Sequence, residues 1–332
     1  MEELTFGWID YTVFSSLLGI SIIIGIYFGF FSKQDTVHEY IYAGKTMSYL
    51  PVAISGLSSF LSGITYLGFT TEIYLYGSQY VIEIIGAIIA SILATHLVLP
   101  VFFKLQLLTV TEYLELRFSK AVRKLCSVTY VVVLIIYCSI IIYAPAIAFS
   151  QLTGIELHLL TLVICTICIF YTSLGGVKAV VWTDTFQFIF TFVGFVSILI
   201  IGVMKVGGFS NIWNASKEGG RIIIFNMNPS IYERSTFFTV LSSVITLYLG
   251  SLGVSQKHVQ KLLTIHEEKE ARKALWAITL GSVTIRMMCI VIGLTICTRN
   301  RGQRVAGRKC THRIQDEDND DDTKDGSAWS QR

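Results

Sequence analysis

The sequence predicts an all-α membrane protein, a multi-pass helical bundle. Of its 332 residues 53% are hydrophobic and only 15% are charged, whereas an average globular domain carries roughly 25% charge. The mean hydropathy is +0.62. The charges gather in clusters, and the runs between them approach or exceed the roughly 20 apolar residues that cross a hydrocarbon core. This pattern is typical of a chain that crosses a membrane several times.

Seven runs without Asp, Glu, Lys or Arg are long enough for such crossings, and we expect a helix in each. They are Tyr11–Ser32, Thr46–Thr71, Ile84–Phe103, Leu125–Ile155, Leu157–Val177, Thr185–Met204 and Ser235–Gln256. An eighth candidate, Ala274–Thr298, carries Arg286 at its middle, which costs about 2.5–3.5 kcal/mol on insertion scales. Its apolar neighbours can compensate for this cost, so about eight transmembrane helices are predicted, the last of them poorly inserted in a fraction of molecules.

The basic residues between these runs predict the orientation of the chain. Thirteen lie on one set of alternate loops, and four lie on the other. The thirteen are Lys33, Lys45, Lys104, Arg117, Lys120, Arg123, Lys124, Lys178, Lys257, Lys261, Lys269, Arg272 and Lys273, and the four are Lys205, Lys217, Arg221 and Arg234. Because the richer side is cytoplasmic in membrane proteins, we expect an extracellular amino terminus and a place in the plasma membrane. Asn214, in the sequon Asn-Ala-Ser, then lies outside as a candidate N-glycosylation site.

The segment YTSLGGVKAVVWTDTFQ (Tyr171–Gln187) separates two of the predicted crossings. Gly175 and Gly176 can take the positive φ values with which helices end. Trp182 suits the headgroup level of a bilayer, and Asp184 begins the next run at the positive end of a helix dipole. This segment is either an ordinary cytoplasmic loop or the loop of a transporter, and we favour the transporter.

The second apolar run is unusually rich in Ser, Gly and Thr. Its hydroxyl residues recur at spacings of three and four, which places them on one helix face; they are Ser55, Ser58, Ser59, Ser62 and Thr65. Gly56, Gly63 and Gly68 weaken the helix along the same stretch. One interpretation is tight helix packing through small residues. The other is a discontinuous helix whose carbonyl and hydroxyl oxygens bind a cation near the bilayer midplane.

Several function classes fit the sequence poorly. No nucleophile–base pair and no cluster of metal ligands lies in the apolar runs, so we expect neither an enzyme nor a cofactor. The net charge of +3 reflects topology, and we expect no nucleic-acid partner. A receptor with seven or eight helices is a remote alternative. The hydroxyl-rich run and the segment after Tyr171 argue against it.

Six segments together resemble the sodium/solute symporter family, nearest its monocarboxylate, multivitamin and iodide branch. They are PVAISGLSSFLSGITYLGFTTEIYLYG (51–77), LPVFFKLQLLTVTEYLELRF (99–118), YAPAIAF (143–149), GGVKAVVWTDTFQ (175–187), KVGGFSNIW (205–213) and GVSQKHVQKLL (253–263). They follow the family's order over roughly Ile9 to Leu294. The TEYLELRF and GGVKAVVWTDTFQ segments are the most specific.

The resemblance implies one leading helix and a ten-helix core of two inverted five-helix repeats, of which this chain holds a part. Residues 1–298 would form the transmembrane symporter domain, the first repeat plus the start of the second. The first, fifth, sixth and seventh core helices map to Thr46–Ile73, Ala179–Met204, Ser235–His258 and Ala271–Thr298.

The same resemblance implies binding sites. Sodium, the coupling ion, would be held by the backbone carbonyls of Ser58 and Leu61, and hydroxyls of an eighth core helix would complete the site. The solute would lie near Phe60 and Thr65 and near Leu249–Gly253.

Asp184 and Lys261 form a candidate cytoplasmic gate. Asp184 starts the fifth core helix on the cytoplasmic side, and Lys261 lies just past the cytoplasmic end of the sixth. A salt bridge between them would join the two repeats and could break and re-form during alternating access. The alternative is a pair of unrelated interfacial charges.

The chain departs from the family at its end. The resemblance stops near Cys297, the eighth core helix is absent, and residues 299–332 are basic and then acidic, as in a disordered tail. Two functions follow. The first is sodium-coupled symport of a small organic anion, a monocarboxylate or vitamin-like solute, across the plasma membrane by alternating access. The second is a truncated fragment that inserts without transporting and associates with full-length protein.

Overall fold

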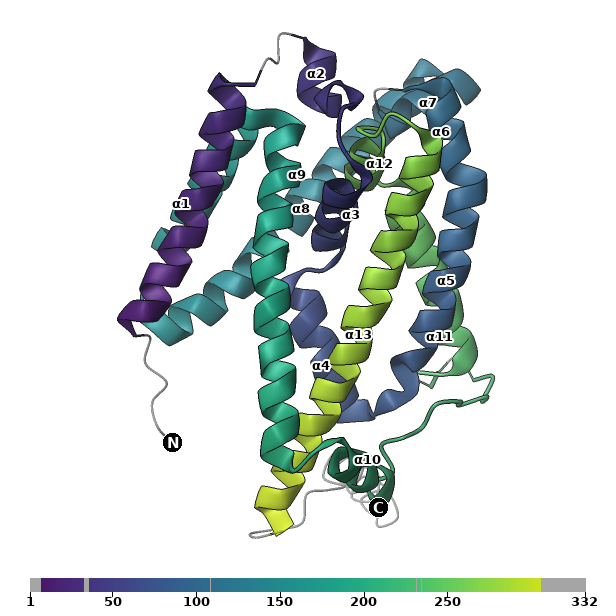
Figure 1. Ribbon diagram of the computed structural model, residues 1–332. Helices are drawn as coiled ribbons and strands as arrows, with labels where there is room; N and C mark the ends of the chain where they lie inside the picture. Colours follow the sequence, from purple (N-terminus) through teal and green to yellow (C-terminus); the bar gives the residue numbers. More distant parts are fainter. Residues whose placement is uncertain (1–6, 33–35, 108, 231, 234, 306–332) are drawn as a thin grey trace, which may run out of the picture.

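The computed structural model describes residues 7–32, 36–107, 109–230, 232–233 and 235–305, and the regular elements in these ranges are helices (Figure 1). The longer ones are α1 (Trp8–Phe30), α3 (Tyr49–Phe60), α4 (Gly63–Tyr76), α5 (Glu83–Leu93), α8 (Lys120–Thr153), α9 (Leu157–Val206), α11 (Phe237–Tyr248) and α13 (Glu268–Val305). The shorter ones are α2 (Val37–Tyr42), α6 (Leu99–Leu105), α7 (Val110–Arg117), α10 (Phe209–Glu218) and α12 (Gln256–Leu262). Four short helical turns lie between them. Two are tight 3₁₀ turns, η1 (Ala43–Lys45) and η2 (Ser78–Ile82), and two are wide π turns, η3 (Ala94–Val98) and η4 (Leu249–Val254).

The helices can be counted as eight membrane crossings. In the described part of the chain six helices are long and apolar enough to cross, and α3 with α4 forms a seventh span that is bent by 55°. The 50 residues of α9 would measure about 75 Å at 1.5 Å per residue, far more than one hydrocarbon core of about 30 Å. Gly176 interrupts α9 with a φ of 59° and a ψ of −158°. The glycine stop expected from the sequence therefore divides α9 into two crossings.

Helix α13 is longer than the sequence predicts. It begins three residues before the expected Ala271 and continues to Val305. The domain boundary placed at residue 298 therefore lies inside a helix, and residues 299–305 of the expected tail are helical. The rest of that tail, 306–332, lies outside the described residues.

The core forms where α13 packs against the broken helix α3–α4 and against α5 and α9. Small residues allow these helices to approach closely. A Cβ added at Gly56 would lie 2.5 Å from Ile278, and one added at Gly281 would lie 2.5 Å from Leu57. Helix α1 contacts α9 in the same manner, because a Cβ on Gly25 would lie 2.5 Å from Cβ of Tyr171.

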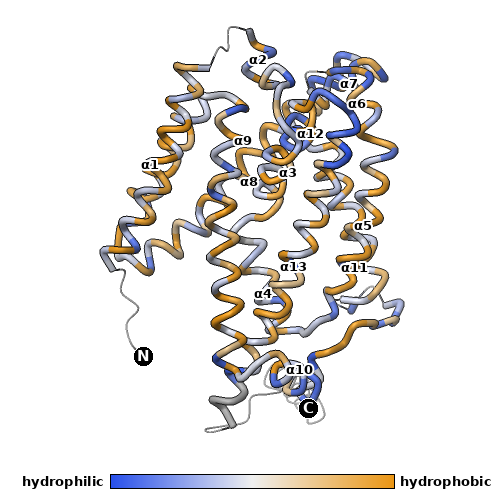
Figure 2. The backbone as a smooth tube through the Cα atoms, viewed as in Figure 1, coloured by the Kyte–Doolittle hydropathy of each residue, from blue (hydrophilic) through white to orange (hydrophobic). Residues whose placement is uncertain are grey.

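Polar residues gather at the two ends of the bundle, and apolar residues follow the long helices between them (Figure 2). Helices α2, α7 and α12 lie together at one end (Figure 1). Helix α10, the start of α1 and the end of α13 lie at the other. The loops expected to be cytoplasmic therefore share one end, and the loop with Asn214 lies at the opposite end.

We predict that Gly293→Ala destabilises the bundle by about 1–3 kcal/mol, the range for overpacking in a dense core. The added Cβ would lie 2.8 Å from Cβ of Ile73 and 2.9 Å from the Thr70 carbonyl oxygen, so backbone must move. Gly194→Ala is the matched control, because it is also helical and has no atom within 4 Å of the added Cβ. Thermal unfolding in detergent compares the two variants, and equal melting temperatures would contradict the prediction.

Candidate functional site

The first core helix is broken at Leu61 and Ser62. Leu61 has an extended backbone, with φ −103° and ψ 100°. Ser62 caps the next helix: its Oγ accepts from the Thr65 amide at 3.2 Å, and the Ser62 amide donates to Thr65 Oγ1 at 3.4 Å. This reciprocal capping box starts α4 as a separate helix. The Ser-Gly-Ile-Thr sequence from residue 62 thus accounts for the interruption expected within Thr46–Ile73.

The break interrupts the hydrogen-bond ladder at the two carbonyls predicted to hold sodium. In a continuous helix the Ser62 amide would donate to the Ser58 carbonyl, but here it donates to a side chain. In the same way the Thr65 amide, which would donate to the Leu61 carbonyl in a continuous helix, donates to Ser62 Oγ. Leu61 is buried and Ser58 is half-buried. Carbonyls at such an end are suited to an alkali ion, which prefers oxygen ligands; sodium binding by Ser58 and Leu61 stays a prediction.

Asp184 and Lys261 are in direct contact. Lys261 Nζ donates to Asp184 Oδ2 at 2.6 Å, to Ser59 Oγ at 2.6 Å and to the Ser55 carbonyl at 3.2 Å. The Ser55 hydroxyl donates to the same Asp184 oxygen at 2.8 Å. The two side chains are only 10% and 18% exposed. This cluster joins α12, α9 and the hydroxyl face of α3, and its role as a gate stays a prediction.

Further hydrogen bonds tie α12 to the same end of the bundle. Gln256 Oε1 accepts from the Val110 amide of α7 at 2.8 Å, and Gln260 donates to the Ile41 carbonyl of α2 at 3.1 Å. His258, between them, is buried. Burial and the charges of Lys257 and Lys261 lower its pKa to about 3. This histidine is therefore neutral at physiological pH.

A second ion pair lies inside the bundle, between Arg286 of α13 and Glu83 of α5. Arg286 Nη1 donates to Glu83 Oε1, and the two residues are 8% and 4% exposed. From the sequence, Arg286 was interpreted only as a cost to membrane insertion, and Glu83 was not predicted to have a role. A signal was present, because an arginine at the centre of a span requires a partner and Glu83 immediately precedes the run Ile84–Phe103.

Three aromatic rings surround the Arg286 guanidinium. Its Cζ lies 5.7 Å from the ring centroid of Phe60, 5.5 Å from Phe69 and 5.3 Å from Tyr248. The negative ring faces stabilise the cation. Phe60 is the last residue of α3 before the break, and Tyr248 is the last of α11. The buried charge therefore lies where the broken helix meets the sixth core helix.

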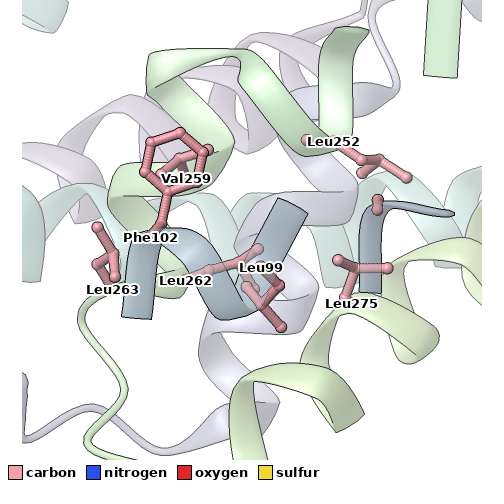
Figure 3. A pocket seen from close by; sticks show the side chains of 9 residues that line it. Leu99, Phe102, Leu252, Val259, Leu262, Leu263 and Leu275 are labelled. Carbon is pink, nitrogen blue, oxygen red and sulfur yellow. The ribbon is translucent and has the colours of Figure 1, made fainter. Parts of the chain in front are cut away.

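The four predicted solute contacts are not all brought together. Phe60 lies beside Arg286, and its ring centroid is 4.6 Å from that of Tyr248, which precedes Leu249; the two rings are tilted by 55°. The Thr65 hydroxyl is engaged in the capping box. Gly253 instead lines an apolar pocket with Leu99, Phe102 and Leu275 and other residues (Figure 3), whose volume of about 10 Å³ leaves room for about one water molecule. In this conformation that pocket holds no solute-sized space.

Asn214 is exposed on α10, whereas Ser216 of its sequon is buried and its hydroxyl has no hydrogen-bond partner among the described residues. The sequon is thus half-buried within a helix.

Comparison with known proteins agrees with this architecture. The profile of the sodium:solute symporter family matches residues 40–319, so the match extends past Cys297, where the resemblance was expected to stop. The human "Sodium-coupled monocarboxylate transporter 2" is 38% identical over 295 residues, which cover 89% of this chain and 48% of that protein. The Drosophila melanogaster "Putative sodium-dependent multivitamin transporter" is 38% identical over 273 residues, or 82% and 45% of the two chains. This chain spans about half the length of these relatives.

A solved structure shares the fold. It shows the substrate-bound, outward-open state of a Na⁺-coupled sialic acid symporter, and it superposes with a TM-score of 0.84 at 25% identity. The match covers 90% of this chain and 63% of that one. The relatives are transporters rather than enzymes, and this chain belongs to the sodium:solute symporter family.

Proposed function

We propose that this chain forms the sodium- and solute-binding part of a symporter that carries a small organic anion, a monocarboxylate or vitamin-like solute, by alternating access. Sodium binds at the carbonyls of Ser58 and Leu61. The solute lies on the other side of Phe60, where the guanidinium of Arg286 supplies the positive charge for its carboxylate. Asp184 and Lys261 close the cytoplasmic side.

One observation carries the proposal: a helix break and a buried arginine occur at the same place. Phe60 immediately precedes the break, and its ring lies 5.7 Å from the Arg286 guanidinium. A break supplies oxygen ligands for a cation, and a desolvated guanidinium is the side chain best suited to a carboxylate. The names of the monocarboxylate and multivitamin relatives support the same solute class.

Uptake of radiolabelled butyrate and biotin by cells that express this chain tests the proposal. We expect saturable uptake that falls to background when choline replaces sodium, because the coupling ion is then missing. Cells with the empty vector are the control. Uptake that is unchanged by choline would contradict sodium coupling.

A second candidate function is a transport-incompetent fragment that associates with a full-length relative. It is favoured by α8, whose most apolar 18-residue window is entirely unburied and is free to pack against another chain. Surface-labelled chain without any uptake, recovered together with a co-expressed full-length relative, supports this second function over the first.

We predict that Asn214 carries an N-linked glycan on the extracellular side. Asn214→Gln should remove the shift in gel mobility that an endoglycosidase produces, and Ser216→Ala should do the same because the transferase requires the hydroxyl residue. Asn211→Gln is the matched control on the same helix. A mobility unaffected by the enzyme, with an epitope after Met1 that is labelled only in permeabilised cells, would contradict both the glycan and the orientation.

A further inference from the structure

The buried ion pair between Arg286 and Glu83 suggests a role in solute binding, which rests on the proposed function. We propose that Glu83 is an internal competitor for the solute at Arg286: the solute carboxylate displaces it, and Glu83 then takes up a proton. One proton would thus bind together with each solute anion.

The ion pair leaves hydrogen-bonding capacity unused. A guanidinium has five N–H donors, and the contact with Glu83 joins Nη1 to Oε1. Arg286 Nε is buried and has no hydrogen-bond partner among the described residues. Glu83 Oε2 is buried as well, and the hydroxyl of Tyr248 is the other polar group beside this carboxylate. An orphaned buried donor is costly and marks a place for a ligand. A carboxylate could engage Nε and an Nη together in the bidentate geometry that guanidinium groups favour.

The surroundings select an anion with an apolar body. Phe60, Phe69 and Tyr248 come from three different helices and cover the guanidinium. Their ring faces are negative and repel a carboxylate, so the anion must reach the guanidinium through its N–H edge. Their apolar surface suits a short alkyl chain behind that carboxylate.

The loss of its partner then favours a proton on Glu83. Arg286 and Glu83 are neutral as a pair, and an added carboxylate brings one negative charge into a buried site. Glu83, once displaced, would be an unpaired buried carboxylate, which costs several kcal/mol. A proton from solution forms one O–H bond on Glu83 and removes this unpaired charge. The result is an Arg286–solute ion pair beside a neutral Glu83.

The sodium ion proposed at the helix break balances the negative charge of the solute anion. It is not a ligand of the Glu83 carboxylate, which has lost its partner. The proton acts on the carboxylate that has lost its partner. Two carboxylates that compete for one site commonly share a proton in this way.

The other titratable groups near Glu83 are few. Helix α13 contributes Arg286 and Cys289, α11 contributes Tyr248, η2 contributes Tyr80, and α4 contributes Glu72. Arginine, cysteine and tyrosine ordinarily ionise above neutral pH. Glu72 is therefore the one neighbour whose titration could imitate that of Glu83, and it provides the control.

The test is calorimetric titration of the chain in nanodiscs with butyrate, in the presence of sodium and in buffers of different ionisation enthalpy. We expect about one proton taken up per butyrate bound, and an apparent affinity that falls about tenfold per unit rise in pH around neutrality. Glu83→Gln should abolish the proton uptake and the pH dependence and raise the affinity about tenfold, because the charged competitor is gone. Glu72→Gln should leave the proton count unchanged, and butyramide should bind without a proton.

The outcomes separate the inference from the proposed function. Butyrate binding without proton uptake by the unaltered chain, or proton uptake that persists in Glu83→Gln, overturns the inference and leaves sodium-coupled symport intact. If Glu83→Gln does not fold, the number of protons taken up by the unaltered chain and the pH dependence of its affinity still test the inference. The absence of both butyrate binding and sodium-dependent uptake overturns the inference and the proposed function together.

Discussion

Arg286→Met is expected to destabilise the folded chain by about 3–5 kcal/mol, the cost of leaving one member of a buried ion pair without its partner. Glu83 is 4% exposed, and among the described residues Arg286 is the cation that pairs with it. Methionine keeps much of the volume of arginine and preserves contact with the three rings, so the loss reports the charge rather than a cavity. Uptake should be abolished as well, because the guanidinium that we propose as the partner of the solute carboxylate is gone.

The matched control for this variant is Arg272→Met on the same helix. Arg272 pairs with Glu268 at 2.5 Å, but the two side chains are 39% and 31% exposed. Such a surface pair contributes about 0–1 kcal/mol, so this variant should remain stable. The double variant Glu83→Gln/Arg286→Met should recover most of the lost stability, because neither charge is then buried alone. Thermal unfolding in detergent compares the three variants with the unaltered chain. Similar losses of stability for Arg286→Met and Arg272→Met would contradict the prediction.

The helices themselves could be predicted from the sequence because the signals are local. Each long run without charge corresponds to a crossing, and Gly176 supplies the positive φ that its position suggested. The break at Ser62 was also foreseeable, since a serine three residues before Thr65 can form a capping box. The contact between Asp184 and Lys261 was predicted from the family resemblance and the topology, and not from the spacing of the two residues.

The partnership of Glu83 and Arg286 could not be derived in the same way. The two residues are 203 positions apart, and a charge at the end of an apolar run is ordinarily interfacial. Only the packing of α5 against α13 brings Glu83 inside. The place of Gly253 escaped prediction for another reason. The wide turn η4 changes the rotation per residue at the end of the sixth core helix, so the face on which Gly253 lies cannot be inferred from helical spacing.

Lys261→Met is expected to open the end of the bundle at which α2, α7 and α12 lie. The Lys261 ammonium holds three oxygen atoms from α3 and α9 in one cluster, and these contacts, with those of Gln256 and Gln260, hold α12 in place. Loss of the ammonium leaves Asp184 with the Ser55 hydroxyl, which donates to its Oδ2 at 2.8 Å. Amide hydrogen exchange in α12 should accelerate by about tenfold for each 1.4 kcal/mol by which the closed arrangement is weakened.

The same variant distinguishes a gate from a structural pair. For a gate, loss of Lys261 shifts the population toward the conformation open to the cytoplasm, so sodium-dependent uptake falls while the melting temperature changes little. The exchanged pair Asp184→Lys/Lys261→Asp should restore part of both the protection of α12 and the uptake, because the attraction across the two repeats is re-formed with opposite polarity. Arg123→Met is the control. Arg123 pairs with Glu115 at 2.5 Å at the same end of the bundle, but this pair joins α7 to α8, and its side chains are 35% and 25% exposed. Unchanged exchange in α12 after Lys261→Met, or equal effects of Lys261→Met and Arg123→Met on uptake, would show that Asp184 and Lys261 are interfacial charges without a gating role.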